Sequence, residues 1–247
     1  MSEFTNLNVL QVGVGGTGSY LVPPLTRFLN SLIRSLSYKA SYYLVDGDIV
    51  EEKNTLRQNF SNDHIGTAKC SVFTDPIIQS FPMMLEKSTY NLLINKLIPR
   101  IKDPTLNVVI GCVDTIEARM NIVEMLELMY KKDTNNVSTF YVDSGNFIST
   151  GQALVFDYQK DSATNIKEKV HKIFEEDKDA VQMDSAPSCT DNGDQSIAAN
   201  FQAASLVYNI VTEILVNRTT SIKKISFMRY SRDIDYNLAE QLARGCV

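Results

Sequence analysis

Residues 13–18 read Gly13-Val14-Gly15-Gly16-Thr17-Gly18, and they decide the fold class of this chain. An apolar run, Leu7–Val12, precedes this glycine turn, and apolar residues at helical spacing from Tyr20 to Leu36 follow it. A strand and a helix joined by a turn without side chains let backbone N–H groups and the helix N-terminus approach phosphates. The turn therefore predicts a nucleotide-binding βαβ unit, although alone it would suit any dinucleotide-binding protein.

A second segment narrows the class of nucleotide chemistry. Residues 46–58 read DGDIVEEKNTLRQ and follow the apolar strand Tyr42–Val45 at nearly the spacing of one βαβ unit. Asp46 ends that strand, where we interpret its carboxylate as a ribose ligand rather than a turn residue. Asp48 suits an Asx-turn and a direct nucleotide contact equally well. A hydride-transfer enzyme has no need of Arg57, whereas chemistry at a triphosphate must hold negative charge during displacement.

Two further charged residues follow elements that lead into the same region. Lys69 comes after Gly66 at a spacing that a helix start would present inward. Asp114 ends a strand that runs through Ile110–Val113, at the carboxyl edge where ligands of parallel sheets gather. Its carboxylate would ligate Mg²⁺ or cap the next helix, and Thr115 offers the cap instead.

The remaining pattern alternates strands and helices. A parallel, doubly wound sheet follows from that alternation, so we expect an α/β, Rossmann-like fold with a mostly parallel sheet and helices on both faces. Residues 60–79 read as mixed loop and helix. Further strands are expected at 107–112, 139–142, 151–156 and 222–227, and helices at 83–101, 116–130 and 196–216.

These motifs in combination resemble one family. The glycine turn, the pattern Asp-x-Asp-x-Val-Glu-x-x-Asn-x-x-Arg-Gln, the pair Gly66 and Lys69, and the run 108–114 followed by Arg119 are similar to ubiquitin-activating enzymes and their bacterial relatives, the ThiF, MoeB and HesA adenylyltransferases. The resemblance covers the chain from about Leu7 to about Phe227. It implies one ThiF-type adenylation domain over residues 1–247, using ATP and Mg²⁺ to activate the C-terminal glycine carboxylate of a ubiquitin-like protein.

The resemblance also implies roles for individual residues. Arg57, with its bidentate guanidinium, is the first candidate for the phosphates, and Lys69 joins it in catalysis. Asp114 would hold Mg²⁺, and Arg119 would support the site. The nucleotide-binding set implied by the family is Gly13, Gly15, Gly16, Gly18, Asp46, Asp48, Asn54, Arg57, Gln58 and Lys69, with a solvated helix start as the alternative for Asn54, Arg57 and Gln58.

Cysteine usage separates this chain from many of those relatives. Cys70, Cys112, Cys189 and Cys246 lie far apart without a C-x-x-C pair, so we expect no zinc site and reduced thiols. Cys189 precedes the long helix, whose N-terminus favours a thiolate. Relatives carry a cysteine there that forms a thioester in some and is dispensable in others, so both roles stay open. We expect Cys70 to be buried in a helix.

Composition limits the partners and the compartment. With 24 basic and 29 acidic residues the net charge is −5, which argues against a general nucleic-acid or membrane binder. No signal sequence or membrane-spanning run is evident, so we expect a cytoplasmic protein. The 11 Tyr and 8 Met residues could line a homodimer interface.

Segments near the end of the chain differ in character. Lys, Glu and Asp dominate residues 157–188, so we expect a mobile crossing segment over the active-site face at 157–191, or a solvated surface helix from Ile166 to Glu176. A polar tail is expected at 229–247. Relatives usually carry an N-terminal arginine that reaches into the neighbouring subunit, and six residues precede the first strand here. We therefore expect that another arginine substitutes, that a partner supplies it, or that the activity is weak.

Three alternative functions remain at the level of sequence. A tRNA-modifying dehydratase of the same superfamily would use the same ATP site but should have a basic surface. An NAD-dependent oxidoreductase explains the glycine turn and leaves Arg57 and Lys69 without a role. A non-catalytic scaffold would bind a ubiquitin-like protein without turnover.

Overall fold

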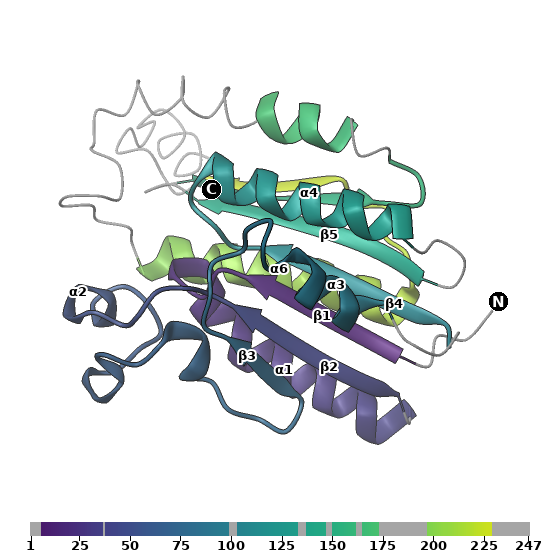
Figure 1. Ribbon diagram of the computed structural model, residues 1–247. Helices are drawn as coiled ribbons and strands as arrows, with labels where there is room; N and C mark the ends of the chain where they lie inside the picture. Colours follow the sequence, from purple (N-terminus) through teal and green to yellow (C-terminus); the bar gives the residue numbers. More distant parts are fainter. Residues whose placement is uncertain are drawn as a thin grey trace, which may run out of the picture.

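A seven-stranded sheet organises the molecule (Figure 1). The computed structural model describes residues 6–36, 38–98, 103–132, 137–146, 150–161, 165–172 and 197–228. The strand order is β3-β2-β1-β4-β5-β6-β7. The strands are β1 (Asn6–Val12), β2 (Lys39–Val45), β3 (Ile78–Phe81), β4 (Thr105–Gly111), β5 (Val137–Asn146), β6 (Thr150–Asp157) and β7 (Lys224–Met228).

Helices cover both faces of this sheet, as predicted. On one face α1 (Gly16–Leu36) and α6 (Ile197–Asn217) pack against each other and against Leu7 and Val9 of β1. On the other face α3 (Tyr90–Leu97) and α4 (Ile116–Lys132) cover Leu10 and Val12. Alternate residues of one strand thus serve two cores, which is why β1 is apolar along most of its length.

Short helices occupy the connection between β2 and β3. They are α2 (Glu52–Thr55), η1 (Asn62–His64) and η2 (Lys69–Ser71). Figure 1 shows α2 beyond the carboxyl ends of β1 and β2. This connection therefore lies at the edge where the glycine turn and Asp46 were expected.

The sheet is parallel from β3 to β5 and antiparallel beyond it. β1 pairs in parallel with β2 and β4, while β5–β6 and β6–β7 are antiparallel. The mostly parallel, Rossmann-like class is confirmed, and the prediction that strand–helix alternation continues to 151–156 is wrong. Residues 147–149 alone separate β5 from β6, whereas a parallel crossover needs a dozen or more residues.

Two local predictions between residues 60 and 101 are also wrong. β3 lies at the end of the stretch read as mixed loop and helix, because four residues give too short a pattern to recognise. The helix expected from 83 begins only at Tyr90. Before it, the Glu86 N–H donates to Thr89 Oγ1 at 3.0 Å and the Thr89 N–H donates to the Glu86 carbonyl at 2.8 Å, so a local turn replaces the first helical turns.

Helix α1 starts earlier than its apolar spacing suggested and contains two prolines. It begins at Gly16, so Pro23 and Pro24 lie inside it rather than in its first turn. Pro23 has no N–H to give to the Ser19 carbonyl four residues back. Asn59 Nδ2 donates to that carbonyl instead, at 3.2 Å, and the Asn59 N–H donates to Ser19 Oγ at 2.9 Å. A proline in α1 is thereby linked to the segment that carries Arg57.

Part of the expected crossing segment is described. Residues 165–172 form a helix, and Ile166 and Val170 are buried in the core under α4, so this helix is packed rather than fully solvated. Residues 173–191 and the predicted tail at 229–247 lie outside the described residues. Within the described ranges, each helix is too short or too polar to cross a bilayer.

Candidate active site

The predicted site residues surround the carboxyl ends of β1, β2 and β4. The strand order reverses here, because the chain runs from β1 to β2 and β3 on one side and then crosses to β4 on the other. Open α/β sheets bind ligands at such a point. The Gly13 N–H donates to the Val45 carbonyl at 2.9 Å, and the Cys112 N–H donates to the Val12 carbonyl at 2.8 Å. These bonds hold the ends of the three strands together and fix the start of the glycine turn.

Close backbone packing explains most of the glycines. Gly13 has φ +93°, and a Cβ there would lie 2.3 Å from the Cys112 carbonyl oxygen. A Cβ on Gly18 would lie 2.2 Å from the Gly13 carbonyl oxygen, and one on Gly16 would lie 2.7 Å from Asn200 Oδ1. Gly15 differs, because the nearest atom to its Cβ would be Gln58 Nε2 at 3.8 Å. Gly15 thus marks the open side of the turn.

Asp46 is bound to the glycine turn through its carboxylate. Oδ2 accepts the Val14 N–H at 2.6 Å, and Oδ1 accepts the Asp48 N–H at 2.8 Å. Burial raises the pKa of Asp46, while these two amide bonds act in the opposite direction. The turn role weighed for this residue is therefore present in the structure, and contact with a ribose stays a prediction.

Lys69 and Asp48 form an ion pair beside Asp46. Lys69 Nζ lies 2.8 Å from Asp48 Oδ2, and the Lys69 N–H donates to the Asp48 carbonyl at 2.9 Å. The Lys69 side chain is 9% exposed, against 64% for Asp48. Lys69 thus points inward, as its spacing after Gly66 predicted. The Asx-type turn weighed for Asp48 is formed by Asp46 instead, which leaves the Asp48 carboxylate to orient the ammonium group.

Asn54, Arg57 and Gln58 do not form a solvated helix start. Asn54 is buried, and its Oδ1 accepts the Glu51 N–H at 2.9 Å, which closes the first turn of α2. Arg57 is half-buried, and its carbonyl accepts a hydrogen bond from Asn200 Nδ2 of α6 at 3.0 Å. Gln58 is buried, and its Oε1 has no hydrogen-bond partner within the described part of the chain. A polar ligand over Gly15 would meet this amide.

Asp114 is exposed just after β4, and it does not cap the next helix. Thr115 Oγ1 accepts the Ala118 N–H at 3.2 Å and takes that role. Among the described residues no group of three acidic, His or Cys side chains forms a ready metal site. A single free carboxylate still fits Mg²⁺, which proteins bind through one or two carboxylates together with waters and substrate phosphates.

Arg119 links the turn that carries Asp114 to β5, because its Nη1 donates to the Thr115 carbonyl at 3.4 Å. Its Nε lies 3.1 Å from Asp143 Oδ2, and its Nη2 donates to the Ser144 carbonyl at 3.0 Å. Tyr141 Oη donates to the other carboxylate oxygen of Asp143 at 2.8 Å. The guanidinium is buried, and the Asp143 carboxylate raises its pKa against the effect of burial. The support predicted for Arg119 is therefore an ion pair to β5.

Gln11 and Tyr42 lie next to the turn, and the sequence did not predict a role for either. Gln11 Nε2 donates to the carbonyls of Gly13 at 2.9 Å and Gly18 at 3.1 Å, and Gln11 Oε1 accepts the Tyr42 hydroxyl. The available signal was a glutamine inside an apolar run that leads directly into the turn.

The cysteines divide into two groups. Cys70 is buried in η2, as predicted, and its thiol donates to the Asp46 carbonyl at 3.6 Å. Cys112 follows β4 rather than lying within it, and burial raises the pKa of its thiol to about 12, so it is protonated at neutral pH. Both are free thiols. Cys189 and Cys246 lie outside the described residues.

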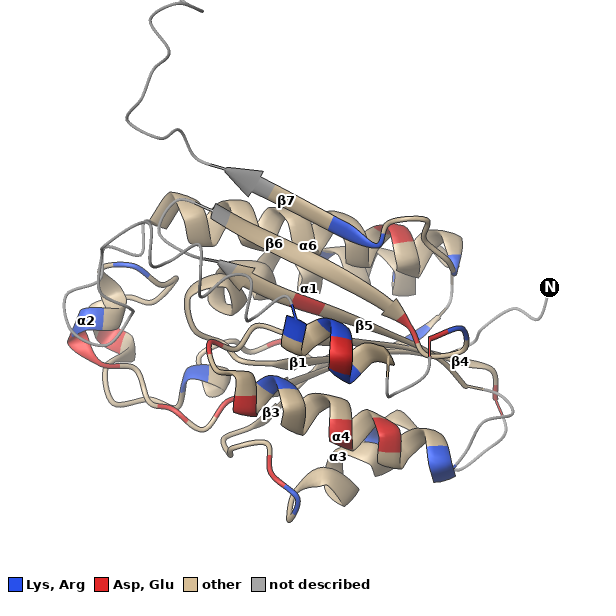
Figure 2. Cartoon of the chain, turned by 90° about the horizontal axis from the view of Figure 1, so that it is seen from above, with Lys and Arg blue, Asp and Glu red and all other residues tan. Residues whose placement is uncertain are grey.

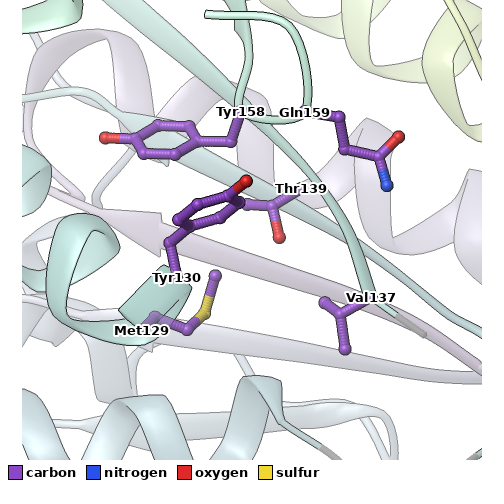
Figure 3. A pocket seen from close by; sticks show the side chains of 6 residues that line it. All are labelled: Met129, Tyr130, Val137, Thr139, Tyr158 and Gln159. Carbon is purple, nitrogen blue, oxygen red and sulfur yellow. The ribbon is translucent and has the colours of Figure 1, made fainter. Parts of the chain in front are cut away.

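The surface carries mixed charge and a small pocket away from this site. Figure 2 shows acidic and basic residues interspersed over α2 and α4. A surface pocket near the amino end of β5, shown in Figure 3, has none of the predicted site residues in its wall. It is lined by Met129, Tyr130, Val137, Thr139, Tyr158 and Gln159.

A family model described as the ThiF family matches residues 1–233. A search of curated proteins found no significant match. Among solved structures, E. coli MccB is 17% identical with a TM-score of 0.49, covering 90% of this chain and 59% of that chain. S. aureus homoserine dehydrogenase at pH 6.0 is 14% identical with a TM-score of 0.29, covering 96% of this chain and 60% of that chain. The chain thus spans about three fifths of the length of these structures.

Proposed function

Because the chain belongs to the ThiF family, we propose that it is an ATP-dependent adenylyltransferase that activates the C-terminal carboxylate of a ubiquitin-like protein. One observation supports this above the others. The glycine turn closed by Asp46, the inward Lys69 and the exposed Asp114 share the carboxyl edge of the same three strands. This arrangement supports a nucleoside site with two charged groups suited to a triphosphate beside it.

The proposed reaction needs no general base. A carboxylate oxygen of the partner's terminal glycine attacks the α-phosphorus of ATP, the bond to the bridging oxygen breaks, and pyrophosphate leaves with that electron pair. The product is an acyl-adenylate. Since the nucleophile is already ionised, the scarcity of histidine in the chain is no obstacle.

The residues of the site would divide the work between binding and charge. The glycine turn and Asp46 hold the nucleoside, with Asn54 and Gln58 shaping the adjoining wall. Arg57 and Lys69 neutralise the phosphates as they separate, and Lys69 must then exchange its bond to Asp48 for a phosphate oxygen. Asp114 would hold Mg²⁺, which supplies further charge stabilisation when bound.

The fate of the acyl-adenylate depends on a thiol or another acceptor. Cys189 is the candidate for a thioester, and sulfur transfer or direct amide formation are the alternatives.

We also propose a cytoplasmic homodimer. A monomer by light scattering at micromolar concentration, with and without ATP, would contradict the assembly.

Pyrophosphate exchange tests the proposal directly. The purified protein is incubated with ATP, Mg²⁺ and ubiquitin-like proteins ending in glycine, and incorporation of labelled pyrophosphate into ATP is followed. Exchange that depends on the partner is expected. ATP binding without exchange for any partner would favour a scaffold, and preference for NAD over ATP would overturn the proposal.

Arg57→Ala sharpens this test. Loss of one charge-assisted phosphate contact should weaken nucleotide binding by about 1.5–3 kcal/mol. Lys53→Ala is the matched control, because Lys53 is exposed in the same segment and pairs with Glu51. Equal rates of pyrophosphate exchange for Arg57→Ala and Lys53→Ala would show that Arg57 is not part of the site.

A further inference from the structure

The four glycines of the turn supply no side chains that could hold its backbone in place. The first N–H groups of α1 have no acceptors within the helix. Those N–H groups would bind a phosphate only if the peptide planes of the turn were fixed in advance. Groups outside the turn must therefore hold it.

Gln11 contacts the turn at both of its ends. Both hydrogens of Nε2 are used, one for the Gly13 carbonyl at 2.9 Å and one for the Gly18 carbonyl at 3.1 Å. A Cβ on Gly18 would approach Gln11 Nε2 to 2.7 Å, so the absence of a side chain at this position makes room for the amide. The carbonyls are thus held on the inner side, toward the sheet.

Tyr42 fixes the orientation of that amide. Its hydroxyl donates to Gln11 Oε1 from the neighbouring strand β2. Gln11 and Tyr42 are both completely buried. Burial holds the pKa of Tyr42 well above its ordinary value, so the hydroxyl remains a donor throughout the neutral range. With Oε1 engaged as an acceptor, the Gln11 amide group can present only its NH₂ to the turn.

We propose that Gln11 and Tyr42 are positioning residues that hold the glycine turn in its nucleotide-binding shape. This inference rests on the proposed ATP site. Asp46 is bound to the turn through the Val14 N–H, and Gln11 is bound to it through the carbonyls of Gly13 and Gly18. Neither Gln11 nor Tyr42 needs to touch the nucleotide, because their effect reaches it through the turn.

A second buried amide pair provides a control. Asn107 Oδ1 accepts a hydrogen bond from Asn8 Nδ2 at 3.1 Å, toward the amino ends of β1 and β4. Replacing Asn107 should destabilise β1 and β4 without changing the turn. Tyr43→Phe controls for the loss of a hydroxyl, since Tyr43 is next to Tyr42 but packs on the opposite face of the sheet.

The experiment compares Gln11→Leu and Tyr42→Phe with Asn107→Leu and Tyr43→Phe. Mg·ATP affinity is measured by calorimetry, stability by urea unfolding, and amide hydrogen exchange of residues 13–19 in nucleotide-free protein by mass spectrometry. We expect Gln11→Leu to lower affinity about tenfold, the equivalent of one to two hydrogen bonds, and to accelerate exchange in the turn. Tyr42→Phe should do both to a smaller extent, and it keeps the test valid if Gln11→Leu fails to fold.

The controls decide between positioning and general destabilisation. Asn107→Leu should lose stability yet keep both the affinity and the exchange rates of the turn. Unchanged exchange in Gln11→Leu and Tyr42→Phe would overturn the inference, and so would an equal loss of affinity in Asn107→Leu. If the wild-type protein binds no ATP, the proposed function fails, while the exchange rates still decide whether these two residues hold the turn.

Discussion

Buried polar side chains at the two ends of the parallel sheet differ in how fully they are hydrogen-bonded. Toward the amino ends, Asn107 Nδ2 donates to the Leu97 carbonyl at 3.1 Å and contacts Thr139 Oγ1 at 3.5 Å, while its Oδ1 accepts from Asn8. At the carboxyl ends, the buried Gln58 Oε1 and Ser144 Oγ have no hydrogen-bond partner in the described part of the chain. Buried polar groups are normally satisfied. At Asn8 and Asn107 the amino end is therefore closed by its own side chains, whereas the two unpartnered oxygens at the carboxyl end suit the ligand proposed there.

The ion pair of Arg119 should have the largest effect on this difference. Arg119→Met would leave the buried Asp143 carboxylate without its cation, which should lower the free energy of unfolding by about 3–5 kcal/mol. Lys131→Met is the control, because Lys131 pairs with Glu127 on the surface and should cost below about 1 kcal/mol. Urea unfolding of both variants gives the comparison, and equal losses would show that β5 does not depend on Arg119.

Gly13→Ala should damage the carboxyl end next most severely. Its positive φ costs about 1–2 kcal/mol for a residue with a Cβ, and contact with the Cys112 carbonyl adds about 1–3 kcal/mol. ATP binding should also fall, since the turn must move. Gly66→Ala is the matched control, with φ +85° and nothing within 4 Å of its Cβ. If thermal unfolding finds both variants equally stable, the close approach to β4 has no energetic weight.

Asn107→Leu should affect only the closed end. Asn8 Nδ2 would lose its bond to Asn107 and keep only the longer one to the Lys96 carbonyl at 3.5 Å, and the expected loss of stability is about 1–3 kcal/mol. Pyrophosphate exchange per folded molecule should stay at the wild-type level. Thr55→Ala, which removes an exposed side-chain bond to the Glu52 carbonyl, should change stability by less than about 0.5 kcal/mol. A defect in exchange with Asn107→Leu would mean that the two ends are coupled.

The last prediction needs no substitution and concerns the interior beside the site. A thiol with a pKa raised to about 12 is protonated at pH 8, so Cys112 should carry roughly a thousandfold less thiolate than an ordinary cysteine. Because the folded pKa is raised, reactivity should increase only as pH approaches that value. Iodoacetamide labelling followed by peptide mass spectrometry measures it, with urea-unfolded protein as the reference. Equal rates in native and unfolded protein would show that water reaches this end freely.

Local sequence patterns were enough to predict much of the fold. The apolar run before the glycines, the helical spacing after them and the β-branched residues of β4 predicted β1, α1 and β4, because each element buries a face whose period appears in the sequence. β3 was missed because four residues give too short a pattern, and the turn before α3 was missed because its local hydrogen bonds compete with an apolar pattern that looks helical. The antiparallel direction of β6 was missed as well, although the short connection after β5 already excluded a crossover.

For the site, the sequence by itself determined which chemical groups follow which strands: glycines after β1, a carboxylate after β2, another after β4. Only the tertiary structure decided which partners each group contacts. Lys69 points inward because η2 is bound to Asp48, and Thr115 rather than Asp114 caps α4. The role of Gln11 could not be read in advance, because it depends on a tyrosine of the adjacent strand and on two carbonyls separated by a helix start. Sequence order specifies neighbours along the chain, whereas hydrogen-bond partners across strands exist only once the sheet has formed.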